Sequence, residues 1–194
     1  MDHQPPPREG CFHGADPDAE LVSQAQLELP YVDTSYEKLM LRYERLMYQI
    51  CRRLLIRPDD AEEVVQEVML KVFHHLTDFE GRAKFKTWLL QIVKRECYSH
   101  YKKNKRHLEQ SDQEKYIDSD VAQTTAAQNR VEREHDVNSI LSRMDVEDRH
   151  VLTLRFIADL DIAEISEVLE LKLSATKMRL YRAIERAKAV AESK

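Results

Sequence analysis

Apolar residues recur at steps of three and four along most of the chain, which is the spacing of one face of an α-helix. The longest stretch of this kind covers residues 33–55. Similar patterns follow at residues 59–76 and 84–106, and a shorter one lies at residues 16–26. The first half of the chain is therefore predicted to form four helices.

Local signals place the ends of these helices. Pro58 ends the helix before it, because proline cannot donate the backbone hydrogen bond that a helix interior needs. Asp60, with Glu63 three residues later, has the pattern of a capping box and is expected to begin the next helix. Gly81 lies in the polar stretch "TDFEGRAK", which predicts a loop before the fourth helix.

The character of the sequence changes after residue 106. Residues 107–125, "HLEQSDQEKYIDSDVAQTT", lack helical periodicity and are rich in polar residues. A stretch of this length without periodicity is typical of a linker between domains. Four short helical patterns follow between residue 126 and the C-terminus.

The last two of these patterns have the spacing of a helix-turn-helix. The first has an apolar face from Ile162 to Leu169, and the second turns Thr176, Leu180, Ala183 and Ile184 inward. Ser174 is expected to cap the second helix. The outward face of that helix consists of Lys177, Met178, Tyr181, Arg182 and Arg186.

Composition supports an all-α fold. Hydrophobic residues make up 42% and charged residues 34% of the 194 residues, which is a globular balance, and the chain has only 3 Gly and 6 Pro for the turns that a β-rich fold requires. We expect a disordered leader (1–16), a first helical domain (17–106), a linker (107–125) and a second helical domain (126–194).

The formal net charge is −5, so the whole chain does not have the charge of a nucleic-acid binder. The charges are unevenly distributed, however, and distribution matters more than the sum. Residues 82–106 contain nine Lys or Arg against one acid, and residues 172–188 contain six against one. These two basic segments are candidate contacts to phosphate, although a solvated helix face has the same composition.

The remaining chemistry of the sequence is sparse. No apolar run approaches the roughly 20 residues that span a bilayer, and the start has no signal-peptide pattern, so a cytoplasmic protein is expected. Cys11, Cys51 and Cys97 lack metal-ligand spacing and predict free thiols. Cys11 and His13 are two potential ligands in the leader, too few to predict a metal. No metal and no cofactor are expected.

The basic segment at residues 84–106 also has an aromatic residue, Tyr98, on its predicted exposed face. Gln91, Arg95, Tyr98 and Lys102 fall on one stripe of the predicted helix. Cations bind phosphates and aromatic rings stack on unpaired bases, so this stripe suits a DNA strand that is being opened. Phe85, Leu89 and the single tryptophan, Trp88, could instead belong to the core, with the basic tail solvated. We favour burial for Phe85 and Leu89, DNA contact for the stripe, and for Trp88 the wall of a base pocket.

Four segments together resemble the bacterial extracytoplasmic-function (ECF) sigma factors of RNA polymerase. They are "DDAEEVVQEVMLKVF", "FKTWLLQIVKRECYSHYKK", "VLTLRF" and "DIAEISEVLELKLSATKMRLYRA", and the similarity extends from about Asp18 to Ala189. The resemblance implies a protein without enzymatic activity that directs core polymerase to promoters, opens the −10 element and reads the −35 element.

The resemblance also implies partners and contact residues. Partners would be core RNA polymerase (the β′ clamp helices and the β flap), promoter DNA and an anti-sigma factor, without membrane insertion. Core polymerase would contact Glu63, Gln66, Glu67, Leu70 and Lys71. The −10 element would contact Phe79, Arg82, Lys86, Trp88, Gln91, Lys94, Arg95, Tyr98, Ser99 and Lys102. The −35 element would contact Lys172, Ser174, Lys177, Met178, Tyr181, Arg182 and Arg186.

The chain departs from the family pattern at the helix-turn-helix and in the melting helix. Glu170 and Ser174 stand where the family usually has glycine, so an altered turn is expected at Glu170. Ala175 and Met178 replace the usual Thr and Ser, and Arg95 stands where Asn is common. The promoter sequence therefore cannot be copied from a relative.

Two other functions fit parts of the sequence. A conventional helix-turn-helix regulator would bind a palindromic site without polymerase. An enzyme could be imagined around His74 and His75, but no nucleophile, phosphate loop or metal spacing accompanies them.

Overall fold

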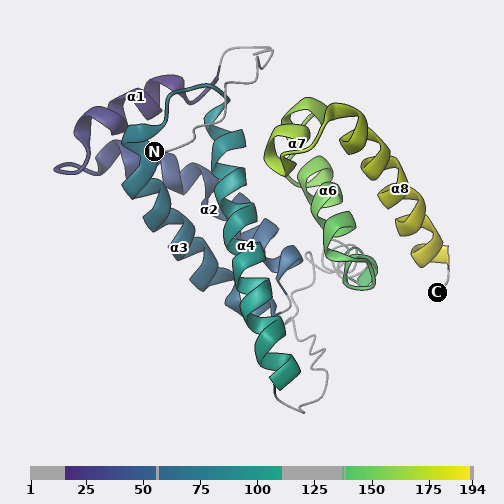
Figure 1. The fold of residues 1–194 in the computed structure, drawn as a ribbon. Coiled ribbons are helices and arrows are strands. Elements are labelled where there is room, and N and C mark those ends of the chain that lie inside the picture. Colours follow the sequence, from purple (N-terminus) through teal and green to yellow (C-terminus); the bar gives the residue numbers. More distant parts are fainter. Residues whose placement is uncertain (1–15, 56, 111–136, 138, 193–194) are drawn as a thin grey trace, which may run out of the picture.

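The computed structural model describes residues 16–55, 57–110, 137 and 139–192, and across these the chain is helical without strands. Two groups of helices lie side by side (Figure 1). The first contains α1 (Ala19–Glu28), α2 (Thr34–Leu54), α3 (Ala61–His75) and α4 (Phe85–Gln110), and the second α6 (Val146–Phe156), α7 (Ile162–Leu169) and α8 (Leu173–Glu192). The predicted all-α fold with two helical domains is confirmed.

The apolar stripes of α2, α3 and α4 face one another and form the core of the first group. Leu39 and Met47 of α2, Val64 of α3, and Phe85 and Leu89 of α4 are fully buried. Each such side chain contributes about 1.5–3 kcal/mol to folding when it leaves water. The burial expected for Phe85 and Leu89 is confirmed.

Helix α1 is held to this core by polar contacts. The carboxylate of Asp18 is buried and accepts hydrogen bonds from Arg42 and from the Tyr43 hydroxyl. Burial first, and then the hydrogen bond to Asp18, raise the pKa of Tyr43. Gln26 donates from Nε2 to the carbonyls of Leu76 (2.8 Å) and Phe79 (2.7 Å), so α1 fixes the segment that leads into α4.

Helix α3 begins directly after Asp60, as predicted, but the capping box expected there with Glu63 is wrong. Residues Pro58–Asp60 form a 3-10 turn (η1), which gives Asp60 a helical φ of −73° and no side-chain capping bond. Its carboxylate instead accepts a hydrogen bond from Asn104 at 2.8 Å, which joins the start of α3 to α4.

Two predicted boundaries also change. Helix α4 continues to Gln110, so residues 107–110, which were predicted to begin the linker, are helical. Residues 111–125 of the linker and the leader residues 1–15, with Cys11 and His13, lie outside the described residues. Helix α8 begins at Leu173, so Ser174 lies in its first turn and is not its N-cap.

In the second group, α7 and α8 form the predicted helix-turn-helix. Asp161 and Glu164 make a complete capping box at the start of α7. Helix α7 ends at Leu169, and the next residue, Glu170, has the left-handed conformation (φ 57°, ψ 38°) that glycine adopts most easily. Glutamate therefore occupies a turn whose backbone conformation glycine adopts more easily.

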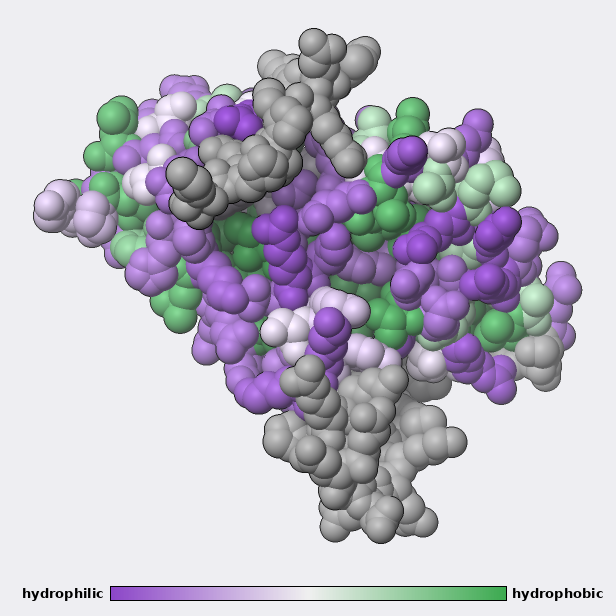
Figure 2. Space-filling view, viewed as in Figure 1, coloured by the Kyte–Doolittle hydropathy of each residue, from purple (hydrophilic) through white to green (hydrophobic). Residues whose placement is uncertain are grey.

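The two helical groups contact each other along two pairs of helices. Helix α7 packs beside α4, and α6 packs beside α2 (Figure 1). Figure 2 shows that hydrophilic side chains cover much of the visible face, with hydrophobic residues among them. Polar side chains of α4, among them Gln91, Lys94 and Arg95, contribute to the contact between the groups.

Candidate nucleic-acid and polymerase interfaces

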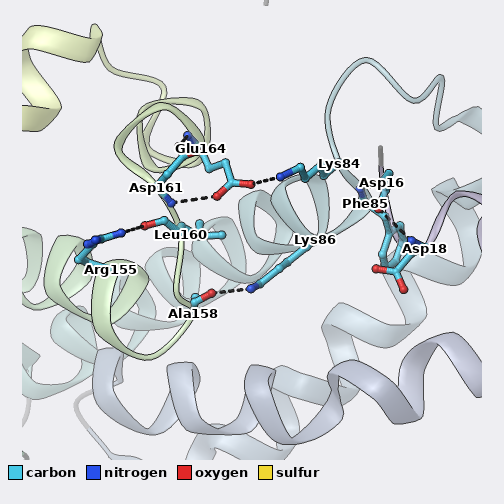
Figure 3. Close-up of polar contacts among 10 residues, drawn as sticks. All are labelled: Asp16, Asp18, Lys84, Phe85, Lys86, Arg155, Ala158, Leu160, Asp161 and Glu164. Atoms are coloured by element: carbon cyan, nitrogen blue, oxygen red, sulfur yellow. Dashed lines mark hydrogen bonds and ion pairs between the residues drawn. The ribbon is translucent and has the colours of Figure 1, made fainter. Parts of the chain in front are cut away.

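Helix α1 and the loop before α4 surround a cavity of about 470 Å³. Gly81 has a φ of +68°, which lets the loop turn sharply. The backbone N–H of Phe85 donates to the carboxylate of Asp16 at 2.7 Å, so a residue ahead of α1 stabilises the N-terminus of α4 (Figure 3). The cavity is lined by Asp16, Ala19, Val22, Ser23, Gln26, Phe79, Glu80, Gly81 and Ala83.

An aromatic cluster lies next to this cavity. The rings of Phe79 and Trp88 are 4.9 Å apart between centroids, and Phe85 lies 5.7 Å from Trp88. Phe85 is buried, whereas Phe79 and Trp88 are partly exposed. Trp88 thus packs beside Phe79 but does not itself line the cavity, and its role as the wall of a base pocket stays a prediction.

The other residues predicted to contact the −10 element lie in the loop before α4 or along one side of that helix, but they differ in accessibility. Arg95, Tyr98, Ser99 and Lys102 are exposed on α4, and the ammonium of Lys102 lies 4.5 Å from the centre of the Tyr98 ring. Such a cation-π contact holds an exposed ring in place. Arg82 is exposed in the loop and pairs with Glu80. Lys86, Gln91 and Lys94 are partly buried.

These three partly buried side chains contact the second helical group. Lys86 donates from Nζ to the carbonyl of Ala158 at 2.5 Å (Figure 3), Gln91 from Nε2 to Glu167 at 3.1 Å, and Lys94 from Nζ to Val168 at 3.1 Å. The predicted DNA-contacting side of α4 is therefore partly occupied by α7 and the residues that precede it.

Ion pairs extend this contact at both ends. Lys84 pairs with Glu164 at 2.8 Å (Figure 3), and this hydrogen bond raises the pKa of Lys84. Arg95 pairs with Glu170 at 3.0 Å, and its hydrogen bond lowers the pKa of that carboxyl. Sequence reasoning did not select Lys84, because a pairing between residues 80 positions apart leaves no local pattern.

Helix α8 presents most of its predicted contact residues to solvent. Lys172, which precedes it, and Ser174, Lys177, Met178, Tyr181 and Arg182 are all exposed. Arg186 is also exposed, but its guanidinium pairs with Asp148 at 2.5 Å and Asp145 at 3.2 Å at the start of α6. Arg186 thus has a structural role that competes with contact to DNA.

The residues predicted to bind core polymerase form one exposed side of α3. Glu63, Gln66, Glu67, Leu70 and Lys71 are all exposed, and Lys71 pairs with Glu96 of α4 at 2.5 Å. A hollow of about 590 Å³ lies between this side and α2, lined by Glu44, Arg45, Tyr48, Glu62, Val65, Gln66 and Met69.

An apolar groove of about 410 Å³ on the second group was not foreseen from the sequence. It is lined by Val137, Ile140, Leu141, Leu152, Thr153, Phe156, Ile157, Ile184, Ala187, Lys188 and Ala191. Phe156 is 64% exposed at its edge. Phe156 is the last residue of α6 and Ile157 follows it, and these two adjacent apolar residues were the local signal in the sequence.

Further features of the described part of the chain concern metal-binding clusters, cysteine pairs and membrane-spanning helices. No cluster of three or more His, Cys, Asp or Glu is placed to hold a metal ion there. Cys51 and Cys97 are buried free thiols with sulfur atoms 3.5 Å apart. Among the helices described, none is long and apolar enough to cross a membrane.

The imidazole of His150 in α6 lies in the field of two positive charges, those of Lys94 in α4 and Arg179 in α8. Its Nε2 is buried without a hydrogen-bond partner, and burial first, with Lys94 and Arg179, lowers the pKa of His150 to about 4. The ordinary value is 6.5, so the unfolded chain binds a proton at a higher pH than the folded chain does. This group therefore stabilises the fold fully above pH 6.5 and less as the pH falls from there towards 4.

We expect acidification from neutral pH to about pH 5 to cost the wild-type chain about 2 kcal/mol of folding free energy through His150 alone. His150→Gln removes the titrating group, so its loss over the same range should be smaller by that amount. Urea unfolding followed by circular dichroism at the two pH values measures the difference. Equal losses in the two proteins would contradict a buried neutral imidazole.

Known families match both helical groups. The sigma-70 region 2 family model matches residues 39–107, and the sigma-70 region 4 family model matches residues 135–186. Together they span more than half of the chain. The two groups therefore define a protein of the sigma factor class, with one region 2 and one region 4.

Comparison with individual proteins narrows this class. The chain is 24% identical over 159 residues to the ECF RNA polymerase sigma factor SigW of Bacillus subtilis, covering 74% of this chain and 81% of that protein. It is 24% identical over 160 residues to the RNA polymerase sigma-H factor of Pseudomonas aeruginosa, covering 78% and 83%. The chain belongs to the sigma-70 family and is an ECF-type sigma factor, which directs promoter-specific initiation of transcription.

A solved structure shares the fold. The sigma factor RpoE of Bartonella quintana, in complex with the anti-sigma factor NepR, superimposes with a TM-score of 0.68 at 21% identity, over 83% of this chain and 98% of that one. The expected family is confirmed, whereas the roles expected for single residues stay predictions.

Proposed function

We propose that the two helical groups divide the work of this sigma factor. Residues 17–106, extended to the end of α4, bind core polymerase and open the −10 element, and residues 126–194 read the −35 element. The observation that carries this proposal is the presence in one chain of a helix with basic and aromatic side chains (α4) and a helix-turn-helix with a basic outer face (α7–α8). The chain needs no active site for this work, and it acts in the cytoplasm with polymerase.

The −10 element would be opened at α4. A base that leaves the duplex must regain its stacking in a pocket. The cavity beside Phe79 has the size of a ligand site, about 300–1,000 Å³, and Trp88 backs the ring of Phe79. Arg95, Tyr98 and Lys102 continue along the same side of α4 and would hold the separated strand.

The −35 element would be read by α8. Its N-terminal half presents Lys177, Met178, Tyr181 and Arg182 to solvent, free of acidic residues. Recognition helices contact base edges with their first turns while flanking cations contact phosphates. Met178 offers an apolar contact, which suits a thymine methyl group.

Protein partners would use two further surfaces. The exposed side of α3, from Glu63 to Lys71, is the proposed site for the β′ clamp helices. The apolar groove around Phe156 would receive an apolar helix, and we assign it to the β flap of core polymerase. An anti-sigma factor, as in the complex of the Bartonella relative, would hold the chain inactive until a stress signal releases it.

Transcription in vitro with core polymerase on a genomic library tests this function. Wild type should give promoter-specific start sites, and their absence would refute the proposal. Arg95→Ala with Lys102→Ala should lower promoter opening about tenfold or more, because each lost contact to the opened strand costs about 1 kcal/mol. Permanganate reactivity of unpaired thymines measures opening.

The control removes the same charge elsewhere. Lys38→Ala with Arg52→Ala deletes two exposed cations of α2 and should leave opening unchanged. Core polymerase should bind both double variants as tightly as wild type. Loss of polymerase binding in the α4 variant would place that side of α4 at the polymerase interface instead of at DNA.

A further inference from the structure

We propose that the free chain is autoinhibited, with α7 of region 4 lying on the DNA-opening side of α4 and the Arg95–Glu170 ion pair holding it there. The proposal rests on the function proposed above, because it concerns the same side of α4. It adds a closed state that the chain must leave before it can bind a single strand.

Four oxygen acceptors of the second group contact polar side chains on α4 or directly before it. Two are the main-chain carbonyls of Glu167 and Val168, which accept from Gln91 and Lys94. Two are the carboxylates of Glu164 and Glu170 at either end of α7. Cations and amide groups that would bind phosphate oxygens of DNA are thus occupied by oxygens of the protein itself.

The end of α7 is electrostatically suited to this task. The last carbonyls of a helix have no partner within the helix and carry its negative partial charge. Lys94 donates to one of these carbonyls, and its ammonium lies 3.6 Å from the carboxylate of Glu170. The C-terminal end of α7 and the carboxylate of Glu170 therefore attract the same two cations, Lys94 and Arg95.

The backbone conformation of the turn does not favour glutamate at position 170. Its positive φ of 57° is strained for a residue with a Cβ atom and relaxed for glycine. Within region 4 the carboxylate has no ion-pair partner among the described residues, and its recorded partners are Lys94 and Arg95 of region 2. The side chain at position 170 thus serves the contact between the two regions.

The closed state leaves other surfaces open. The α3 side from Glu63 to Leu70 and the α8 side from Ser174 to Arg182 are exposed while α4 is covered. Polymerase can therefore bind region 2 before the regions separate. Because the ion pairs are partly exposed, they are individually weak and screened by salt, so the closed state can be opened by a competing partner.

Glu170→Gln tests the proposal with little change in shape, and Glu170→Gly removes the carboxylate while relaxing the turn. Small-angle X-ray scattering of the full chain, without polymerase, measures closure. Fluorescence anisotropy with a labelled single-stranded DNA of mixed sequence measures access to α4. Both variants should show a larger radius of gyration than wild type and bind the oligonucleotide about fivefold more tightly.

Two further variants sharpen the result. Glu185→Gln removes an exposed carboxylate of α8 whose recorded partner is Lys188, and it should behave as wild type in both measurements. Arg95→Glu should open the chain, and adding Glu170→Arg should close it again. An unchanged radius in Glu170→Gln, or an opened chain that binds the oligonucleotide no better, would overturn autoinhibition. Neither measurement uses core polymerase, so failure of the transcription assay remains a separate outcome.

Discussion

Phe85→Ala is expected to lower the free energy of unfolding of region 2 by about 3–5 kcal/mol, because it leaves a cavity where a large side chain was fully buried. Phe85 is the first residue of α4, and its ring packs against Tyr43 of α2 and Trp88, with centroids 5.6 Å and 5.7 Å away. Urea unfolding followed by the fluorescence of Trp88, the one tryptophan of the chain, reports on region 2 directly.

Leu70→Ala is the matched control within the same helical group. Leu70 is 61% exposed on α3, so its truncation should change the unfolding free energy by less than about 0.5 kcal/mol. A similar small effect of Phe85→Ala would mean that α4 does not depend on this ring for its position. In that case the pocket beside Phe79 would lack the rigid support that base capture requires.

The helices could be predicted because their information is local. In α2 and α4 a periodic apolar stripe continues for many turns, and the burial of Leu39, Phe85 and Leu89 follows from it. Helix ends were less predictable. Asp60 has the residue type of a cap, but the 3-10 turn before it changes its backbone angles, and its carboxylate is used by Asn104 instead.

The composition of the candidate sites could be predicted, but not their accessibility. Periodicity assigns Gln91, Lys94 and Arg95 to the polar side of α4, and they do lie there. It cannot indicate that α7 covers this side, because the partners Glu167 and Glu170 come from a segment joined through a linker. The carboxylate of Asp16 likewise accepts a hydrogen bond from the backbone N–H of Phe85, a contact between distant segments that no local pattern indicates.

Lys177→Ala with Arg182→Ala is expected to lower transcription from promoters that depend on a −35 element by about thirtyfold or more. Each contact to a base or phosphate is worth about 1–3 kcal/mol, and the two side chains are exposed on the outer face of α8. Run-off transcription with the reconstituted holoenzyme measures the loss. Promoters read through the −10 element alone should be nearly unaffected, since region 2 is unchanged.

The salt dependence of promoter binding distinguishes a lost DNA contact from a damaged fold. Each lost phosphate contact makes the slope of log K against log salt shallower by about 0.9. The slope of the double variant should therefore be shallower than that of wild type by up to about two. Arg52→Ala removes an exposed cation of α2, outside region 4, and should keep the wild-type slope. Because unfolding would weaken binding at every salt concentration alike, an unchanged slope with lower affinity in the double variant would contradict α8 as the helix that contacts DNA.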